Sequence, residues 1–183
     1  MKTQTALLLL VLACLPMVGR AEGLDAAIQA KVDAEIKAIE TWAKDPAIVQ
    51  AVKTHNTTPP ADAAAMTQDK WKSLTVLDPA VRAFSKNPTA DFIKSKKTEA
   101  VSEAFVSAAD GTKVAFLAKT SGWSHKGKPK HDAPMSGKNW QGAVEVDEST
   151  GLQQVQVAVP VIDGDKPIGS LVVGLSLAKL GKN

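Results

Sequence analysis

The sequence has almost no cysteine and no tyrosine, and both shortages narrow what the chain can be. Its 183 residues contain one cysteine, Cys14, no tyrosine, and only 4% aromatic residues. Cys14 lies in an apolar N-terminal run, and the chain beyond it contains no cysteine. A chain without cysteine cannot form disulfides, thiolate metal sites or covalent c-type haem attachments, and it has no cysteine nucleophile.

The first residues have the pattern of a secretory signal peptide. Lys2 supplies a positive start, residues 6–18 are apolar, and the small residue Ala21 follows. The apolar run is too short for a permanent membrane helix, and no later stretch is long and apolar enough to be one. We expect a signal peptide over 1–21, cleavage after Ala21, and a mature protein in the periplasm.

Cys14 leaves a second processing route open. Residues 11–14, Val-Leu-Ala-Cys, loosely resemble the signal in which a small residue precedes a lipidated cysteine. The apolar run continues beyond Cys14 through residues 15–18, which favours simple cleavage over lipoprotein anchoring.

The charge of the mature chain gives no support for nucleic-acid binding. The whole chain has 22 basic and 19 acidic side chains, and removal of Lys2 and Arg20 leaves 20 against 19. A nearly neutral secreted protein lacks the basic surface that nucleic acid needs, so we predict no nucleic-acid partner.

Residues 103–177 have the alternating pattern of a sheet. Asp110-Gly111 suits a tight turn, and valines at 155, 157, 159 and 161 share one face of a long strand. This pattern predicts a five-stranded antiparallel sheet with one buried face. The expected strands are 104–108, 114–118, 143–147, 152–162 and 168–177.

Residues 24–98 have the pattern of helices. Apolar residues recur at steps of three and four from Leu24 to Trp42, and Asp45-Pro46 suits the start of a second helix. Two prolines, Pro59 and Pro60, end it. Shorter helices are expected at 61–74, after Asp78-Pro79 and at 90–97.

The order of these strands and turns resembles single Cache domains. The segments that carry the resemblance are Phe105–Gly111, Val144–Gly151, Val155–Val161 and Pro167–Gly174. Cache (PDC) domains are PAS-like extracytoplasmic sensor modules of bacteria, and the resemblance covers roughly residues 24–180. It implies an α+β fold, with a long N-terminal helix and short helices packed on a five-stranded antiparallel sheet. The single domain would span 22–183, with its helical part at 24–98 and its sheet part at 103–177.

The connection between the second and third expected strands, residues 120–142, is the candidate site. It carries four lysines and two histidines against one acid, and long loops without regular structure are usually functional or mobile. In the resembling family this connection forms a wall of the ligand pocket. Trp123 and Trp140 match its recurrent aromatic positions, and Asp147 matches a carboxylate that can hold a ligand's amine.

The resemblance implies small-ligand sensing, and the lysines favour an anion such as a small carboxylate. A charge-assisted hydrogen bond contributes about 1.5–3 kcal/mol. The tyrosine-dependent amino-acid motif of double Cache domains is absent, because the chain has no tyrosine. The residues predicted to line the pocket are Trp71, Phe105, Lys119, Ser121, Trp123, His125, Lys126, Trp140 and Asp147.

Ordinary structural roles stay open for these residues. The tryptophans also suit a core, Asp147 suits a turn, and Arg82 suits a surface ion pair. The lysines, which are Lys126, Lys128 and Lys130, also suit a solvated loop. A metal could be held by His125, His131 and Asp132. Because Pro129 separates the histidines in an expected mobile loop, and no fourth ligand is evident, we predict no metal site and no cofactor.

Catalysis finds little support. Ser121 and Ser124 lie near His125 without a Gly-x-Ser-x-Gly elbow, and neither a phosphate-binding glycine loop nor zinc-spaced ligands occur. We therefore predict a sensor rather than an enzyme. Because the sequence stops soon after the last strand, we expect it to signal to a membrane histidine kinase, chemoreceptor or cyclase. The alternatives are a ligand-free interaction module that uses its long helix to form a homodimer or to dock on a partner, and a periplasmic metal- or cofactor-binding protein.

Overall fold

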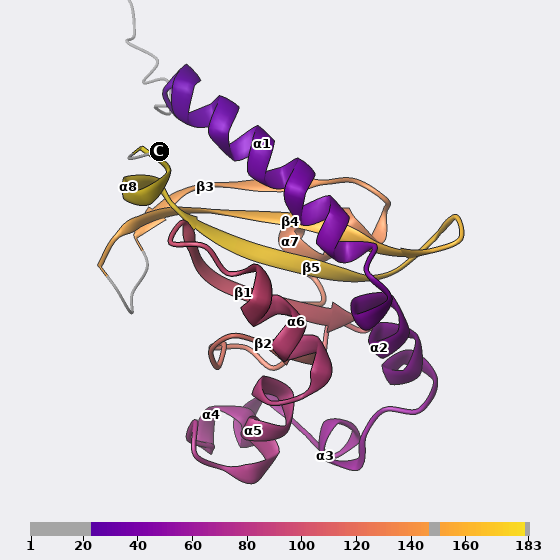
Figure 1. Cartoon of the computed structure of the whole chain (residues 1–183). Helices are drawn as coiled ribbons and strands as arrows, with labels where there is room; N and C mark the ends of the chain where they lie inside the picture. Colours follow the sequence, from indigo (N-terminus) through magenta and orange to yellow (C-terminus); the bar gives the residue numbers. More distant parts are fainter. Residues whose placement is uncertain (1–22, 147–150, 182–183) are drawn as a thin grey trace, which may run out of the picture.

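A computed structural model describes residues 23–146 and 151–181 (Figure 1). Within these ranges, eight helices accompany a five-stranded antiparallel sheet, which confirms the predicted α+β fold. The helices are α1 (Ala26–Ala43), α2 (Pro46–Thr57), α3 (Ala61–Ala64), α4 (Gln68–Ser73), α5 (Pro79–Ser85), α6 (Pro88–Lys96), α7 (Pro129–Met135) and α8 (Leu177–Leu180). The strands are β1 (Val101–Ala108), β2 (Lys113–Phe116), β3 (Trp140–Val146), β4 (Gln153–Asp163) and β5 (Lys166–Ser176).

Capping side chains set the starts of the helices. Asp25 accepts a hydrogen bond from the backbone N–H of Ala27 at the start of α1, and Asp45 accepts one from Ala47 at the start of α2. The prediction of a single helix over 61–74 is wrong, because the helix is interrupted between α3 and α4. Thr67 is extended there and caps α4 by accepting from the N–H of Lys70.

The strand order is β2-β1-β5-β4-β3, with every neighbouring pair antiparallel (Figure 1). The hairpin of β4 and β5 occupies the middle, and its register runs from Gln154 beside Ser176 to Asp163 beside Lys166. β1 and β3 each begin three residues before the expected strand. Leu177, expected to end β5, instead begins α8. Among the helices of the two described ranges, none is both long and apolar enough to cross a membrane.

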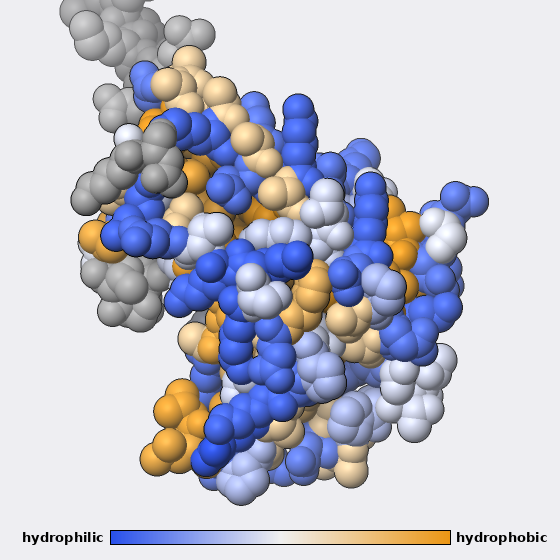
Figure 2. Space-filling view, viewed as in Figure 1, coloured by the Kyte–Doolittle hydropathy of each residue, from blue (hydrophilic) through white to orange (hydrophobic). Residues whose placement is uncertain are grey.

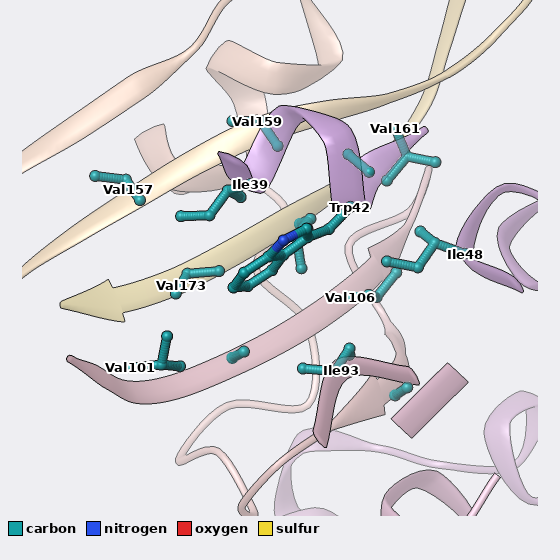
Figure 3. Close-up of a cluster of buried hydrophobic side chains, with 14 of the residues drawn as sticks. Ile39, Trp42, Ile48, Ile93, Val101, Val106, Val157, Val159, Val161 and Val173 are labelled. Carbon is teal, nitrogen blue, oxygen red and sulfur yellow. The ribbon is translucent and has the colours of Figure 1, made fainter. Parts of the chain in front are cut away.

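Both faces of the sheet are buried at β1, β4 and β5, so the prediction of one buried face is wrong, although the edge strand β3 is exposed over residues 143–146. The valines of β4 join Ile39, Trp42 and Ile48 in the core beneath α1 and α2 (Figure 3). On the other face, Gln154 and Gln156 are also buried. The alternation of valine and glutamine predicted a wet second face, but α4, α5, α7 and the connection cover it.

The connection over 120–142 is not an irregular loop. It contains α7, with Pro129 in the first turn, where the missing proline N–H costs nothing. His131 of this helix is 1% exposed and lies against β5, where its Nδ1 is 2.8 Å from the Ser170 Oγ. The expectation of a mobile loop is therefore wrong for this part of the connection.

The outer surface around α1 is largely hydrophilic. Figure 2 shows mostly hydrophilic side chains on this side of the molecule, with small apolar areas between them. Val32 and Ile39 of α1 are fully buried against the core, and Ile28 and Ile36 are partly buried there. A contact between two copies through α1 would therefore use the polar side of the helix.

Candidate ligand pocket

A pocket of about 420 Å³ lies on the second face of the sheet, between the strands and the connection. β1 supplies Glu103 and Phe105, and β4 supplies Gln154 and Gln156. β3 adds Glu145. The connection supplies the opposite wall, including Ser121, His125 and Lys130. The pocket thus lies where the Cache resemblance predicted one, between the sheet and the residues that follow β2.

The structure brings four of the nine predicted site residues into this pocket. They are Phe105, Lys119, Ser121 and His125. Lys126 is exposed and does not line it, and Asp147 lies outside the described residues.

The three tryptophans that were predicted to line the pocket lie in or against a neighbouring aromatic cluster. The ring centroids of Trp71 and Trp123 are 5.2 Å apart, and Phe84 lies 5.1 Å from Trp123. The indole N–H of Trp71 donates to the backbone oxygen of Thr120 at 2.7 Å. Trp140 is half-buried and packs against the same cluster. These rings fix the start of the connection over the sheet but do not line the pocket.

One wall of the pocket is a chain of polar side chains. Lys130 Nζ donates to Gln156 Oε1 at 2.8 Å, and Gln156 Nε2 donates to the Glu103 carboxylate. Gln154 Nε2 likewise donates to Glu145 Oε1 at 3.2 Å. The wall therefore offers one ammonium group and two carboxylates, held by two amides from β4.

Lys130 is the cation that α7 contributes. Burial lowers its pKa, while the nearby carboxylates of Glu103 and Glu145 raise it. Lys119 is a second cation at the pocket, with its Nζ 4.8 Å from the centre of the Trp71 ring, a distance typical of a cation–π contact. Sequence patterns had suggested Lys126 as a site cation, but α7 turns Lys130 inward instead.

The floor of the pocket rests on a buried lysine that sequence reasoning missed. Lys113 is 0% exposed, and its Nζ contacts His125 Nδ1, lies 3.3 Å from Ser107 Oγ, and is 4.5 Å from the centre of the Phe105 ring. Burial, with the charge of Lys130, lowers the pKa of Lys113 to about 7. Lys113 follows the Asp110-Gly111 turn by two residues, and no local sequence pattern distinguishes it from an exposed turn lysine.

His125 lies between Lys113 and the pocket. Burial, followed by the charge of Lys113, lowers its pKa to about 3, so the imidazole is neutral at physiological pH. His131 and Asp132, two of the three candidate metal ligands, form hydrogen bonds within the protein. His131 lies on Ser170, and Asp132 accepts from the N–H of Gly127 at 3.0 Å. Across the described residues, no three His, Cys, Asp or Glu side chains lie close enough together to hold a metal ion.

Comparison with known proteins gives matches among solved structures. No protein-family model matches the sequence, and the search of curated proteins gives no match. The sensor domain of Escherichia coli DcuS is 18% identical with a TM-score of 0.49, over 86% of this chain and 97% of that one.

Two further matches are larger sensor proteins. The sensor domain of the Vibrio cholerae histidine kinase DctB is 15% identical, with a TM-score of 0.48 over 85% of this chain and 54% of that one. The ligand-binding domain of the Pseudomonas aeruginosa amino-acid chemoreceptor PctC, solved with GABA, is 16% identical, with a TM-score of 0.47. The match covers 85% of this chain and 57% of the PctC chain. The chain spans about half the length of these two, and the similarity is one of fold.

Proposed function

We propose that this protein is a sensor module that binds a small carboxylate-bearing metabolite. The observation that carries the proposal is the pocket of about 420 Å³ between sheet and connection, with charged side chains on its walls. This volume is in the range of small-molecule sites.

The charges of the pocket suggest how such a ligand would lie. A carboxylate would pair with Lys130, whose Nζ donates to the neutral amide oxygen of Gln156. A charge-assisted bond to a carboxylate is stronger than a bond to an amide. The body of the ligand would rest near Phe105, and a polar far end would meet Gln154 and Glu145. Three charge-assisted bonds of up to about 3 kcal/mol each would reach micromolar affinity, about −8 kcal/mol, whereas two would need additional contacts.

The proposal also covers the compartment of the protein, its signalling partner and its association with a second copy. We propose that the chain acts in the periplasm after loss of residues 1–21, which lie outside the described residues. Its signal would pass to a membrane histidine kinase, chemoreceptor or cyclase, and a homodimer through α1 is part of this proposal. No catalytic step is assigned to it.

A thermal-shift screen tests the proposal. The purified protein is heated with carboxylates, amino acids, amines and divalent cations, because a ligand that binds only the native state raises the melting temperature. We expect a carboxylate to raise it, and Lys130→Met to abolish the rise. Lys128→Met, the matched control, removes an exposed cation from the start of α7 and should keep the rise.

Two outcomes contradict the proposal. If no compound shifts the melting temperature, the interaction-module alternative is favoured, and the search moves to protein partners. If the rise survives in Lys130→Met but disappears in Lys128→Met, the ligand occupies another place.

A further inference from the structure

Lys113 is a lysine that the fold buries without a carboxylate partner. Its side chain is fully enclosed, and within the described ranges it takes part in no ion pair. Its Nζ touches only a hydroxyl, an imidazole nitrogen and an aromatic face, which are those of Ser107, His125 and Phe105. An enclosed ammonium without a counter-charge is costly, so this site favours the neutral amine.

The other charges around Lys113 are distributed unevenly. Lys130, from α7, opposes its positive charge, while Glu103 of β1 and Asp110 of the β1–β2 turn favour it. His131 also belongs to the cluster, but its two nitrogens lie 2.8 Å from Ser170 Oγ and 3.3 Å from the Ala109 oxygen. Glu103 lies on the pocket wall but is hydrogen-bonded to Gln156, and neither it nor Asp110 forms an ion pair with Lys113 among the described residues.

His125 is the hydrogen-bond partner of Lys113 at the pocket. Lys113 Nζ and His125 Nδ1 share one hydrogen bond, so the two groups gain or lose a proton as a pair. The Nε2 edge is turned toward Gly122, where a side chain would come within 3.8 Å of it, beside the pocket-lining Ser121. His125 itself lines the pocket, so the Lys113–His125 pair lies at the pocket wall.

We propose that binding of a carboxylate in this pocket is coupled to uptake of one proton by the Lys113–His125 pair. Lys113 is then a positioning residue that acts through His125. The inference rests on the proposed function and adds the regulation of its site. The proton comes from solvent and leaves the pair with one positive charge, which the carboxylate balances.

The ionisation of Lys113 gives the direction of the effect. With its pKa lowered to about 7, the pair in the ligand-free protein loses its proton as pH rises through that value. A bound anion favours the charged form, so ligand binding raises this pKa. Above pH 7 the affinity should fall about tenfold for each pH unit, because each binding event must then recruit a proton.

Calorimetry with succinate tests the coupling. If succinate is not the tightest-binding carboxylate of the screen, that compound replaces it. Titration at pH 8 in phosphate and in Tris, buffers with different ionisation enthalpies, gives the number of protons taken up. We expect close to one for the wild-type protein, and close to none for Lys113→Met, whose affinity should not vary between pH 7 and 9. Lys128→Met should behave like the wild type.

A second variant separates the two residues. His125→Phe keeps a ring against Phe105 but removes the polar ring nitrogens at the pocket wall, so it should weaken binding at every pH. Carboxylate binding with no proton uptake, or an unchanged pH profile in Lys113→Met, would overturn the coupling and leave the proposed function standing. If no carboxylate binds the wild-type protein, both fail.

Discussion

The imidazole of His125 lies flat against the ring of Phe105, with centroids 4.8 Å apart and planes inclined by 21°. This stack joins the connection to β1 and forms the floor of the pocket. Two ammonium groups, those of Lys113 and Lys130, lie 4.5 and 5.8 Å from the centre of the same Phe105 ring. Phe105 therefore contacts both the pocket-lining Lys130 and the buried Lys113 behind His125.

Replacing Phe105 by leucine should affect both stability and binding. Leucine keeps an apolar side chain but loses the stack and the face that the ammonium groups meet. We expect the free energy of unfolding to fall by roughly 1–2 kcal/mol, and carboxylate affinity to fall several-fold. Denaturant unfolding and calorimetry measure the two effects.

Phe92→Leu is the matched control for this prediction. Phe92 lies on α6 and packs on the hydrophobic core beneath α1 and α2. A lysine, Lys96, also lies with its Nζ 5.2 Å from the centre of the Phe92 ring. Its replacement should leave carboxylate affinity unchanged. Equal loss of affinity in both variants would mean that Phe105 acts only through general stability.

The buried lysine predicts a rise in stability with pH. The pKa of Lys113 is lowered to about 7 in the native state, whereas an unfolded lysine titrates near 10.4. Between these values the unfolded chain binds more protons than the native protein, so the free energy of unfolding rises with pH, by at most about 1.4 kcal/mol per unit. Below pH 7 both states are protonated, and the full cost of burying the charge remains.

Urea unfolding at pH 7, 8 and 9 checks this slope. Lys113→Met should be more stable than the wild type at pH 7 and should lose most of the rise. Lys126→Met, on an exposed residue near the same turn, should keep it. A wild-type stability that stays flat over this range would show that Lys113 remains charged in the native protein.

The core beneath α1 and α2 could be predicted from the sequence because the patterns that indicate it are local. The valines of β4 alternate within one strand, and Asp45-Pro46 marks a helix start within two residues. Both patterns depend only on the chain nearby. The strand and helix pattern therefore located the sheet and its first covering layer.

The candidate site depends on contacts between distant parts of the chain. Gln156 looks like a solvent-facing strand residue until α7 brings Lys130 over it, 26 residues away in the sequence. Lys113 looks like a turn lysine until His125 closes over it. Nothing in the local sequence of either residue records the partner that buries it, so the floor and the charged wall could not be predicted.

Gly169 should tolerate no side chain, because β1 and α2 approach it from two sides. A Cβ there would lie 2.4 Å from the backbone oxygen of Ser107 and 2.8 Å from Val52 Cγ1. The Ser107 oxygen belongs to the strand paired with this position, so it cannot move without disturbing the ladder. We expect Gly169→Ala to lower the free energy of unfolding by roughly 1–3 kcal/mol. Gly23→Ala, which meets no atom within 4 Å, should change it by less than about 0.5 kcal/mol. Thermal and denaturant unfolding of both variants measure this difference, and equal stability would mean that the backbones of β1 and β5 lie farther apart at Gly169 than these distances require.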